Sequence, residues 1–374
     1  MKNTLKFKND GTLTVMQITD THCIFKPTSD TVRLIKGALD KVKPDLAVLT
    51  GDQIKGYGTA YWFGDTLKRV EMGIDNTCSI LEERNIPFAA TFGNHDPQAR
   101  IPLDKQMEIY KRYKSFVETD DDLVYGAGTY ALPIMSSDGK EPAFNIYIVD
   151  SGSYAPEGGY ASVEKEKIEW YKKTRDKFLE KYGHYIPSFM FQHIPVHEMY
   201  DILEKVDKKT PGAVRAFRTH KNEYYILPKE IADKGGVLLE PPSISDTNTG
   251  QFDAVSEKGD VIGFFFGHDH KNTFITKHRG VDIGYSPSCG FKEYGNDVER
   301  GVRVYVLNEK EPEKYSTYVL TYRELFGKKT LNPLRTKFYN LVPTSVAAGV
   351  SLCSKLLVGL AVIITAIVLL CKYL

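Results

Sequence analysis

Side chains able to bind a metal ion follow five apolar runs of the chain, each with the length of a β-strand. They are Asp20 and His22 after the first run, then Asp52, Asn94 and His193 after later runs, and His268 and His270 after the last. Because open α/β sheets bind ligands at the carboxyl ends of their strands, these side chains can meet in one crevice. They offer oxygen and imidazole donors and no thiolate, a set that suits divalent zinc, manganese or iron.

Each of these groups alone is weak evidence for a metal site. An aspartate after a strand commonly serves a turn, and a lone histidine such as His193 has several other roles. The segment Gly267-His268-Asp269-His270 is more specific, because two imidazoles two residues apart in an extended segment point to the same side. All five groups in this order, each after an apolar run, predict a single metal-binding site.

The elements that must position these residues alternate between strand and helix in the first part of the chain. Apolar runs predict strands over 13–18, 45–49 and 87–92, with periodic helical sequence at 32–42 and 65–84. Further strands are predicted over 144–149, 188–191, 261–266, 281–285 and 301–307. This order indicates a layered α/β domain with mixed sheets.

Residues 204–260 form the least regular part of the chain. Pro-Gly, Gly-Gly and Pro-Pro pairs punctuate this segment and predict an excursion made of loops. Such loops lie at the surface, so the segment is either a substrate-selecting rim of the site or a solvent-facing insertion.

Charge and cysteine usage exclude some classes of function. The 374 residues include 49 lysines and arginines against 48 aspartates and glutamates, a balance unlike that of a nucleic-acid binder. The five cysteines are scattered, with no C-x-x-C pair. Reduced thiols in a cytosolic setting are therefore expected, rather than disulfides or a thiolate zinc site.

The C-terminal segment differs from the rest of the chain. Leu356–Cys371 is a run of 16 uncharged residues, about 24 Å long as a helix and shorter than a hydrocarbon core of roughly 30 Å. A helix that begins at Ser354 and ends at Leu374 would be long enough to span the core if the Lys355 side chain reaches the lipid headgroups. Upstream basic residues would place the large domain on the cytoplasmic side. We therefore expect a single-pass C-terminal membrane anchor; the alternative is a buried helix of the domain.

The spaced motifs resemble a known family. They are Asp20-x-His22, Gly51-Asp52, Gly93-Asn94-His95-Asp96, His193 and Gly267-His268-x-His270, which together resemble the full signature of the calcineurin-like metallophosphoesterases over most of residues 13–307. Residues 43–52 (KPDLAVLTGD), 149–152 (VDSG) and 191–195 (FQHIP) resemble the purple-acid-phosphatase-like subgroup. The resemblance implies a four-layer α/β sandwich of two mixed sheets flanked by helices, with metals at the sheet edge.

The same resemblance implies two divalent metal ions (iron, manganese or zinc) that share Asp52 as a bridging ligand. One ion would be held by Asp20, His22, Asp52 and His270, and the other by Asp52, Asn94, His193 and His268. His95 would act on the leaving-group oxygen, oriented by Asp96. Purple enzymes proper carry a tyrosine three residues after the bridging aspartate, where this chain has Lys55. A coloured ferric centre is therefore not expected.

Hydrolysis of phosphate esters is chemistry that such a site can perform. The ester is anionic and repels hydroxide, so neutral-pH hydrolysis needs charge neutralisation and a strong nucleophile. Two cations about 3.5–4 Å apart clamp the phosphoryl oxygens and hold a bridging hydroxide, because metal-bound water has its pKa lowered to about 7. General-acid catalysis by His95 would add a factor on the order of 10²–10⁴.

Three regions follow from these observations: a catalytic domain over 1–325, a basic juxtamembrane linker over 326–344 and a transmembrane anchor over 345–374. The leading hypothesis is a membrane phosphatase acting on monoesters of a small molecule or a phosphoprotein. Two alternatives stay open. One is a phosphodiesterase, or a phosphoesterase of nucleotides or sphingolipids. The other is a non-catalytic metal-binding membrane scaffold that recruits partners.

Overall fold

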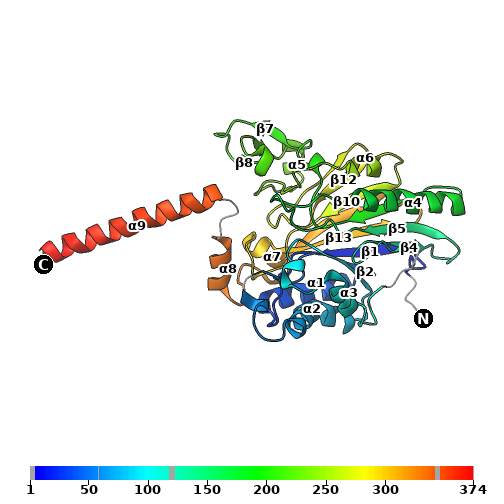
Figure 1. The fold of residues 1–374 in the computed structure, drawn as a ribbon, viewed down its shortest axis with the longest axis horizontal. Coiled ribbons are helices and arrows are strands. Elements are labelled where there is room, and N and C mark those ends of the chain that lie inside the picture. The colour runs from blue at the N-terminus through cyan, green and yellow to red at the C-terminus, as the bar shows by residue number, and fades with distance from the viewer. Residues whose placement is uncertain (1–4, 58, 118–122, 342–345, 374) are drawn as a thin grey trace.

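Two mixed β-sheets lie face to face at the centre of the molecule, and helices cover their outer sides (Figure 1). The computed structural model describes residues 5–57, 59–117, 123–341 and 346–373; the side chains of residues 346–349, 351–352 and 367–373 are outside that description. The arrangement confirms the expected α/β fold of two mixed sheets flanked by helices.

The first sheet carries the three earliest candidate groups. Its strand order is β14-β13-β1-β2-β3. The strands are β1 (Thr12–Ile18), β2 (Leu46–Thr50), β3 (Phe88–Thr91), β13 (Gly301–Asn308) and β14 (Ser316–Thr321). Because β1, β2 and β3 are parallel, their carboxyl ends lie along one edge of the sheet. Asp20, Asp52 and Asn94 follow those ends.

The second sheet carries the histidines that come later in the chain. Its strand order is β11-β12-β10-β6-β5-β4. The strands are β4 (Tyr130–Met135), β5 (Pro142–Ile148), β6 (Ser188–Phe191), β10 (Val261–Phe266), β11 (Ile275–His278) and β12 (Val281–Tyr285). β6 and β10 are parallel neighbours, so His193 and His268 leave the sheet side by side.

A buried glutamine joins the two sheets at the edge where the candidate groups gather. Gln17 Nε2 donates to Thr50 Oγ1 (3.0 Å) and to the carbonyl of Phe266 (3.1 Å). Tyr305 donates its hydroxyl to Gln17 Oε1 (2.8 Å). A buried amide left unpaired costs about 1–3 kcal/mol, so these bonds stabilise one alignment of β10 against β1 and β2.

Helices cover the outer sides of the two sheets, whereas the last helix, α9, projects away from them (Figure 1). The described helices are α1 (Ser29–Val42), α2 (Thr66–Glu82), α3 (Leu103–Tyr110), α4 (Lys165–Tyr182), α5 (Lys229–Ala232), α6 (Gln251–Ser256), α7 (Tyr322–Phe326), α8 (Pro333–Asn340) and α9 (Val346–Tyr373). In α1 the buried residues Leu34, Ile35, Ala38 and Leu39 recur with helical spacing. The helices α1, α2 and α3 cover the first sheet, whereas α4 and α6 lie over the second (Figure 1).

The segment predicted as loops contains a small sheet. It has the order β7-β9-β8, formed by Glu204–Val206, Tyr224–Ile226 and Val214–Arg215. These strands have two or three residues each, so they are too short to be recognised from a periodic sequence pattern. Their pairing is antiparallel.

The C-terminal segments form two helices. The predicted linker contains α8, and Arg335 of this helix makes an ion pair of 2.9 Å with the buried Asp30 of α1. The predicted anchor falls on α9. Across the described part of the chain, no helix combines the length and the apolarity needed to cross a membrane. The expected transmembrane helix over 345–374 is therefore not confirmed. Residues 345 and 374 of that span, and the side chains at 346–349, 351–352 and 367–373, lie outside the described part of the chain.

Candidate metal centre

Several candidate ligands sit in an unusual backbone conformation directly after their strands. Asp20, His22, Asp52 and His268 have φ angles of 52°, 44°, 50° and 72°. The left-handed region is uncommon for residues other than glycine, and such conformations cluster at functional sites, where surrounding bonds hold them. Here the bonds run between the loops: Asp20 N–H donates to the Gly51 carbonyl (3.1 Å), and His22 N–H donates to the Asp52 carbonyl (3.0 Å).

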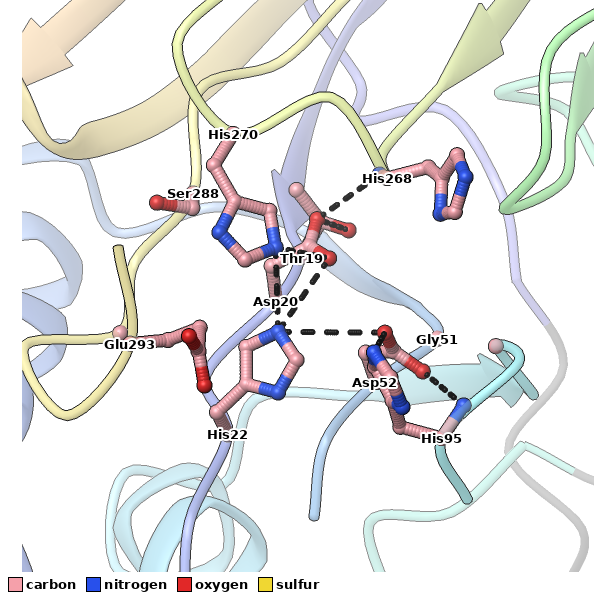
Figure 2. Close-up of polar contacts among 12 residues, drawn as sticks. Thr19, Asp20, His22, Gly51, Asp52, His95, His268, His270, Ser288 and Glu293 are labelled. Atoms are coloured by element: carbon pink, nitrogen blue, oxygen red, sulfur yellow. Dashed lines mark hydrogen bonds and ion pairs between the residues drawn. The ribbon is translucent and has the colours of Figure 1, made fainter. Parts of the chain in front are cut away.

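One group of donors lies around Asp20 (Figure 2). His270 Nε2 is 3.2 Å from Asp20 Oδ1, and His22 Nε2 is 3.7 Å from the same oxygen. The two imidazoles face each other, with 3.1 Å between their Nε2 atoms. Two neutral imidazole lone pairs repel at that distance, so a proton or a cation between them is required.

A second group lies around Asp52. His193 Nε2 is 3.2 Å from Asp52 Oδ2 and 3.8 Å from Asp20 Oδ1. His268 Nδ1 lies 3.2 Å from His193 Nε2. Asp52 Oδ2 is also 3.8 Å from His22 Nε2 of the first group. Asp52 Oδ2 and Asp20 Oδ1 are therefore each near both groups of imidazoles.

The oxygen atoms of the site fit a cation. Asp20 Oδ1 and Asn94 Oδ1 are buried and have no hydrogen-bond partner within the described residues. The other oxygen of Asp20 accepts from Thr19 Oγ1 (2.7 Å) and from the backbone N–H of His268 (3.0 Å). Buried polar atoms are nearly always paired. Asn94 Oδ1, which is unpaired, and Asp20 Oδ1, which faces imidazole nitrogens, therefore have the surroundings expected of metal ligands.

The charges of the site explain why it needs a cation. Burial raises the pKa of Asp20 and Asp52, but the neighbouring histidines, His193 foremost, outweigh burial and hold both pKa values below their usual range. Burial lowers the pKa of His193, but Asp52 and Asp20 raise it to about 10. Without metal, a proton on His193 thus offsets only part of the charge of the two buried carboxylates. A divalent cation would take the place of this proton.

The structure shows no contact between Asp96 and the His95 ring that it was predicted to orient, among the hydrogen bonds of the described residues. Asp96 Oδ2 accepts from the backbone N–H groups of Asp52 (2.9 Å) and Gly93 (2.7 Å), and its Oδ1 accepts from that of Ile54 (3.2 Å). The carboxylate is thus used to hold two loops together. His95 Nδ1 lies 2.6 Å from Gln98 Oε1 instead. The side chain that orients the imidazole is therefore Gln98.

His95, the predicted general acid, lies beside Asp52. Its backbone N–H donates to Asp52 Oδ1 (2.8 Å), and its Nε2 is 4.0 Å from Asp52 Oδ2 (Figure 2). The imidazole is partly exposed, whereas the candidate ligands are buried. Burial lowers the pKa of His95 to about 4 despite the nearby Asp52.

The structure adds residues to which the sequence assigned no role in the site. The Tyr57 ring centroid lies 4.3 Å from that of His95, and the Tyr57 hydroxyl donates to Glu293. Lys55 forms an ion pair with the same carboxylate (2.7 Å) and occupies the position of the tyrosine of purple enzymes. Tyr154 accepts a hydrogen bond from Asn94 Nδ2 (2.7 Å). Only Gln98 carried a usable sequence signal, since it follows His95 by three residues in a turn.

The chain belongs to the calcineurin-like phosphoesterase family, whose model matches residues 13–272. That span contains all seven candidate ligands together with His95, Asp96 and Gln98. The residues of the two buried Asp/His groups lie within the matched span and gather at one edge of the sheets.

Curated relatives place the chain near proteins named for purple acid phosphatases. It is 26% identical over 329 residues to the probable inactive purple acid phosphatase 14 of Arabidopsis thaliana, covering 78% of this chain and 74% of the relative. Identity to the probable inactive purple acid phosphatase 29 of the same plant is 27% over 310 residues, covering 76% and 71%. Phosphatase DCR2 of Saccharomyces cerevisiae is 26% identical over 344 residues, covering 82% of this chain and 53% of DCR2.

A solved structure shares the fold. A dimetal phosphatase from Danio rerio superposes with a TM-score of 0.50 at 12% identity, covering 83% of this chain and 99% of the zebrafish chain. At that identity the likeness concerns the fold alone.

Proposed function

We propose that this protein is a metal-dependent phosphoric ester hydrolase that acts on phosphate monoesters. The observation that carries the proposal is the position of Asp52 Oδ2, 3.2 Å from His193 Nε2 and 3.8 Å from His22 Nε2. One carboxylate oxygen thus faces both groups of donors. When bound, two divalent cations would neutralise the phosphoryl charge and activate a water molecule.

The protein's own residues would bind and orient the reactants. Asp20, His22, Asp52 and His270 would hold one ion, and Asp52, Asn94, His193 and His268 the other. Asp96 keeps the loops of Asp52 and Gly93 in register through backbone bonds. This preorganisation matters because donors fixed before the reaction need no rearrangement in the transition state.

His95 would donate a proton to the leaving-group oxygen. Gln98 Oε1 is an acceptor only, so its contact of 2.6 Å requires a hydrogen on His95 Nδ1. Nε2 is then the nitrogen that exchanges a proton with the reacting groups. Because burial lowers the pKa of His95 to about 4, Nε2 would carry that proton only once the negative charge of a bound phosphate ester raises this pKa. Because the imidazole is partly exposed beside the buried ligands, a leaving group can reach it from solvent.

Hydrolysis of a chromogenic phosphate ester by the metal-loaded protein tests the proposal. Activity should require added metal, disappear in Asp52→Asn and fall about 10²-fold or more in His95→Ala. His184→Ala, on the exposed surface, is the matched control and should be unaffected. Inactivity of the metal-loaded protein on a broad panel of mono- and diesters would contradict the proposal.

A non-catalytic metal-binding protein is the second candidate, because two of the relatives carry the words "probable inactive" in their names. It predicts stoichiometric metal binding without turnover. His95 argues against this candidate, since metal holding alone does not need that residue. Metal content and turnover measured on the same preparation separate the two candidates.

The finer predictions from sequence keep their own tests. Rates on monoester, diester, nucleotide and sphingolipid substrates would rank the substrate classes, and metal analysis of protein from its native host would identify iron, manganese or zinc. Membrane attachment with a cytoplasmic domain stays a prediction. If this prediction holds, the full chain should sediment with membranes, whereas a chain that ends at residue 343 should stay in the soluble fraction.

A further inference from the structure

A short hairpin, residues 153–161, lies against the loop that carries Asn94. The backbone N–H of Ala155 closes the hairpin by donating to the Gly159 carbonyl (3.0 Å). Ser153 Oγ donates to the carbonyl of Asn94 (2.9 Å). The hairpin is thus bonded directly to the backbone of a candidate metal ligand.

The hairpin holds the ring of Tyr154 in one place. Tyr154 stacks on Tyr160 with 5.5 Å between the centroids, and Tyr160 stacks on Phe217 at 5.4 Å. Arg218 packs on the hairpin tip so closely that a Cβ at Gly159 would lie 2.6 Å from its Nε. Aromatic pairs of this kind contribute about 0.5–1.5 kcal/mol beyond the area they bury. The Tyr154 ring is therefore supported from behind while 42% of the residue stays exposed.

The hydroxyl of Tyr154 is hydrogen-bonded to the side-chain amide of Asn94. Asn94 Nδ2 donates to Tyr154 Oη (2.7 Å), whereas Asn94 Oδ1 is buried and has no hydrogen-bond partner within the described residues. A phenol hydroxyl can pair with either end of an amide, as acceptor or as donor. As an acceptor here, Tyr154 stabilises the orientation in which the carboxamide oxygen, the atom that can bind a metal, faces the site, and its own proton stays available.

The proton of the same hydroxyl is available to a ligand. Tyr154 Oη is 3.4 Å from His95 Nδ1, but Nδ1 already carries the hydrogen that it donates to Gln98 Oε1 (2.6 Å). A nitrogen that carries hydrogen cannot accept another. Within the residues that the structure describes, the hydroxyl proton of Tyr154 has no acceptor, and it lies next to the proposed general acid. A phosphoryl oxygen is an acceptor of suitable charge.

We propose that Tyr154 has two roles in this site: it orients Asn94 toward the metal, and it donates its hydroxyl proton to a non-bridging phosphoryl oxygen of the substrate. The second role rests on the proposed phosphoesterase function. The first role concerns metal binding and does not depend on turnover.

The variant Tyr154→Phe tests both roles, because it keeps the stacked ring and removes the hydroxyl. Calorimetric titration of the metal-free protein with Mn²⁺ should show affinity for one of the two ions reduced by about tenfold or more, the effect typical of residues that orient metal ligands. Titration of the Mn²⁺-saturated protein with inorganic phosphate should show affinity weakened about tenfold, as for one lost hydrogen bond to a charged group. With a chromogenic ester the Michaelis constant should rise by a similar factor.

The controls separate this proposal from the function on which it rests. Tyr318→Phe, a half-exposed tyrosine on the edge strand β14, should leave both affinities unchanged, and thermal melting of each variant checks the fold. If the wild-type protein has no turnover, the two binding titrations still report on Tyr154. Loss of Mn²⁺ affinity alone would overturn the phosphoryl contact. Unchanged affinities for both Mn²⁺ and phosphate would overturn the whole proposal.

Discussion

Gln98 Oε1 accepts the Nδ1 hydrogen of His95 at 2.6 Å, and this neutral amide occupies the place that the sequence assigned to the carboxylate of Asp96. An amide fixes the tautomer and direction of the imidazole without adding a negative charge. A carboxylate in that position would raise the pKa of His95, because it favours the imidazolium form.

Removal of the amide should impair catalysis and leave metal binding intact. Gln98→Ala leaves the His95 ring free to rotate, so we expect kcat to fall about tenfold with little change in Mn²⁺ affinity. Gln98→Glu keeps an acceptor and adds a charge. It should retain more of the rate than Gln98→Ala and move the alkaline limb of the pH–rate profile to higher pH. Steady-state kinetics across pH check both results, and identical profiles for Gln98→Glu and the wild type would contradict them.

Asp96 should matter for stability more than for proton transfer. The residue is buried and accepts three backbone N–H bonds, from Asp52, Gly93 and Ile54. Asp96→Ala leaves these donors unpaired, at about 1–3 kcal/mol for each buried group that finds no water. We expect the free energy of unfolding to fall by at least about 2 kcal/mol in urea denaturation. Asp138→Ala, in an exposed turn, is the control. An equal loss of unfolding free energy in both variants would contradict a structural role for Asp96.

Metal binding should release a proton. The pKa of His193 is raised to about 10 by Asp52 and Asp20, against the effect of burial, so this residue is protonated at pH 7 in the metal-free protein. A cation must displace that proton, and Mn²⁺ affinity should increase with pH. Calorimetric titrations at pH 7, in two buffers with different ionisation enthalpies, measure the proton count. Identical heats in the two buffers would rule out the release.

The same pKa shift predicts how the metal-free protein responds to alkali. The folded-state pKa of His193 lies above its unfolded value of about 6.5, so the stabilisation is fully present below pH 6.5 and is lost as pH rises through about 10. The free energy of unfolding should decline between these values. Replacement by His193→Gln should flatten the decline, and so should saturation with metal. If the free energy of unfolding declined equally in His193→Gln, the decline would have to come from another titrating group.

The loops of the site approach so closely that glycine is required at one contact. A Cβ on Gly93 would lie 2.3 Å from Asp52 Oδ1 and 2.6 Å from the Asp52 nitrogen. Gly93→Ala should therefore displace the Asp52 side chain and abolish Mn²⁺ binding. Gly359→Ala, where an added Cβ meets no atom within 4 Å, serves as the control. Wild-type Mn²⁺ affinity in Gly93→Ala would contradict the close approach.

Sequence alone predicted the donors and the fold class because both depend on local patterns. Apolar runs of strand length ended at Asp20, Asp52, His193 and His268, and the structure has strands ending just before each of them. Parallel strands must then present those residues at one edge. The family resemblance, now shown by the match over residues 13–272, rested on the same short motifs.

Tertiary structure alone decided the partners of these residues. Asp20 receives its bond from the backbone of His268, which is 248 positions away, and no local pattern specifies such a pairing. The family resemblance implied that Asp96 orients His95, but the turn directs that carboxylate into the loops and brings Gln98 to the imidazole. Tyr154 reaches Asn94 only because a hairpin 60 positions later folds back on the site. Spacing determines which groups share an edge of the sheet; the packing of loops from two sheets determines which atoms touch.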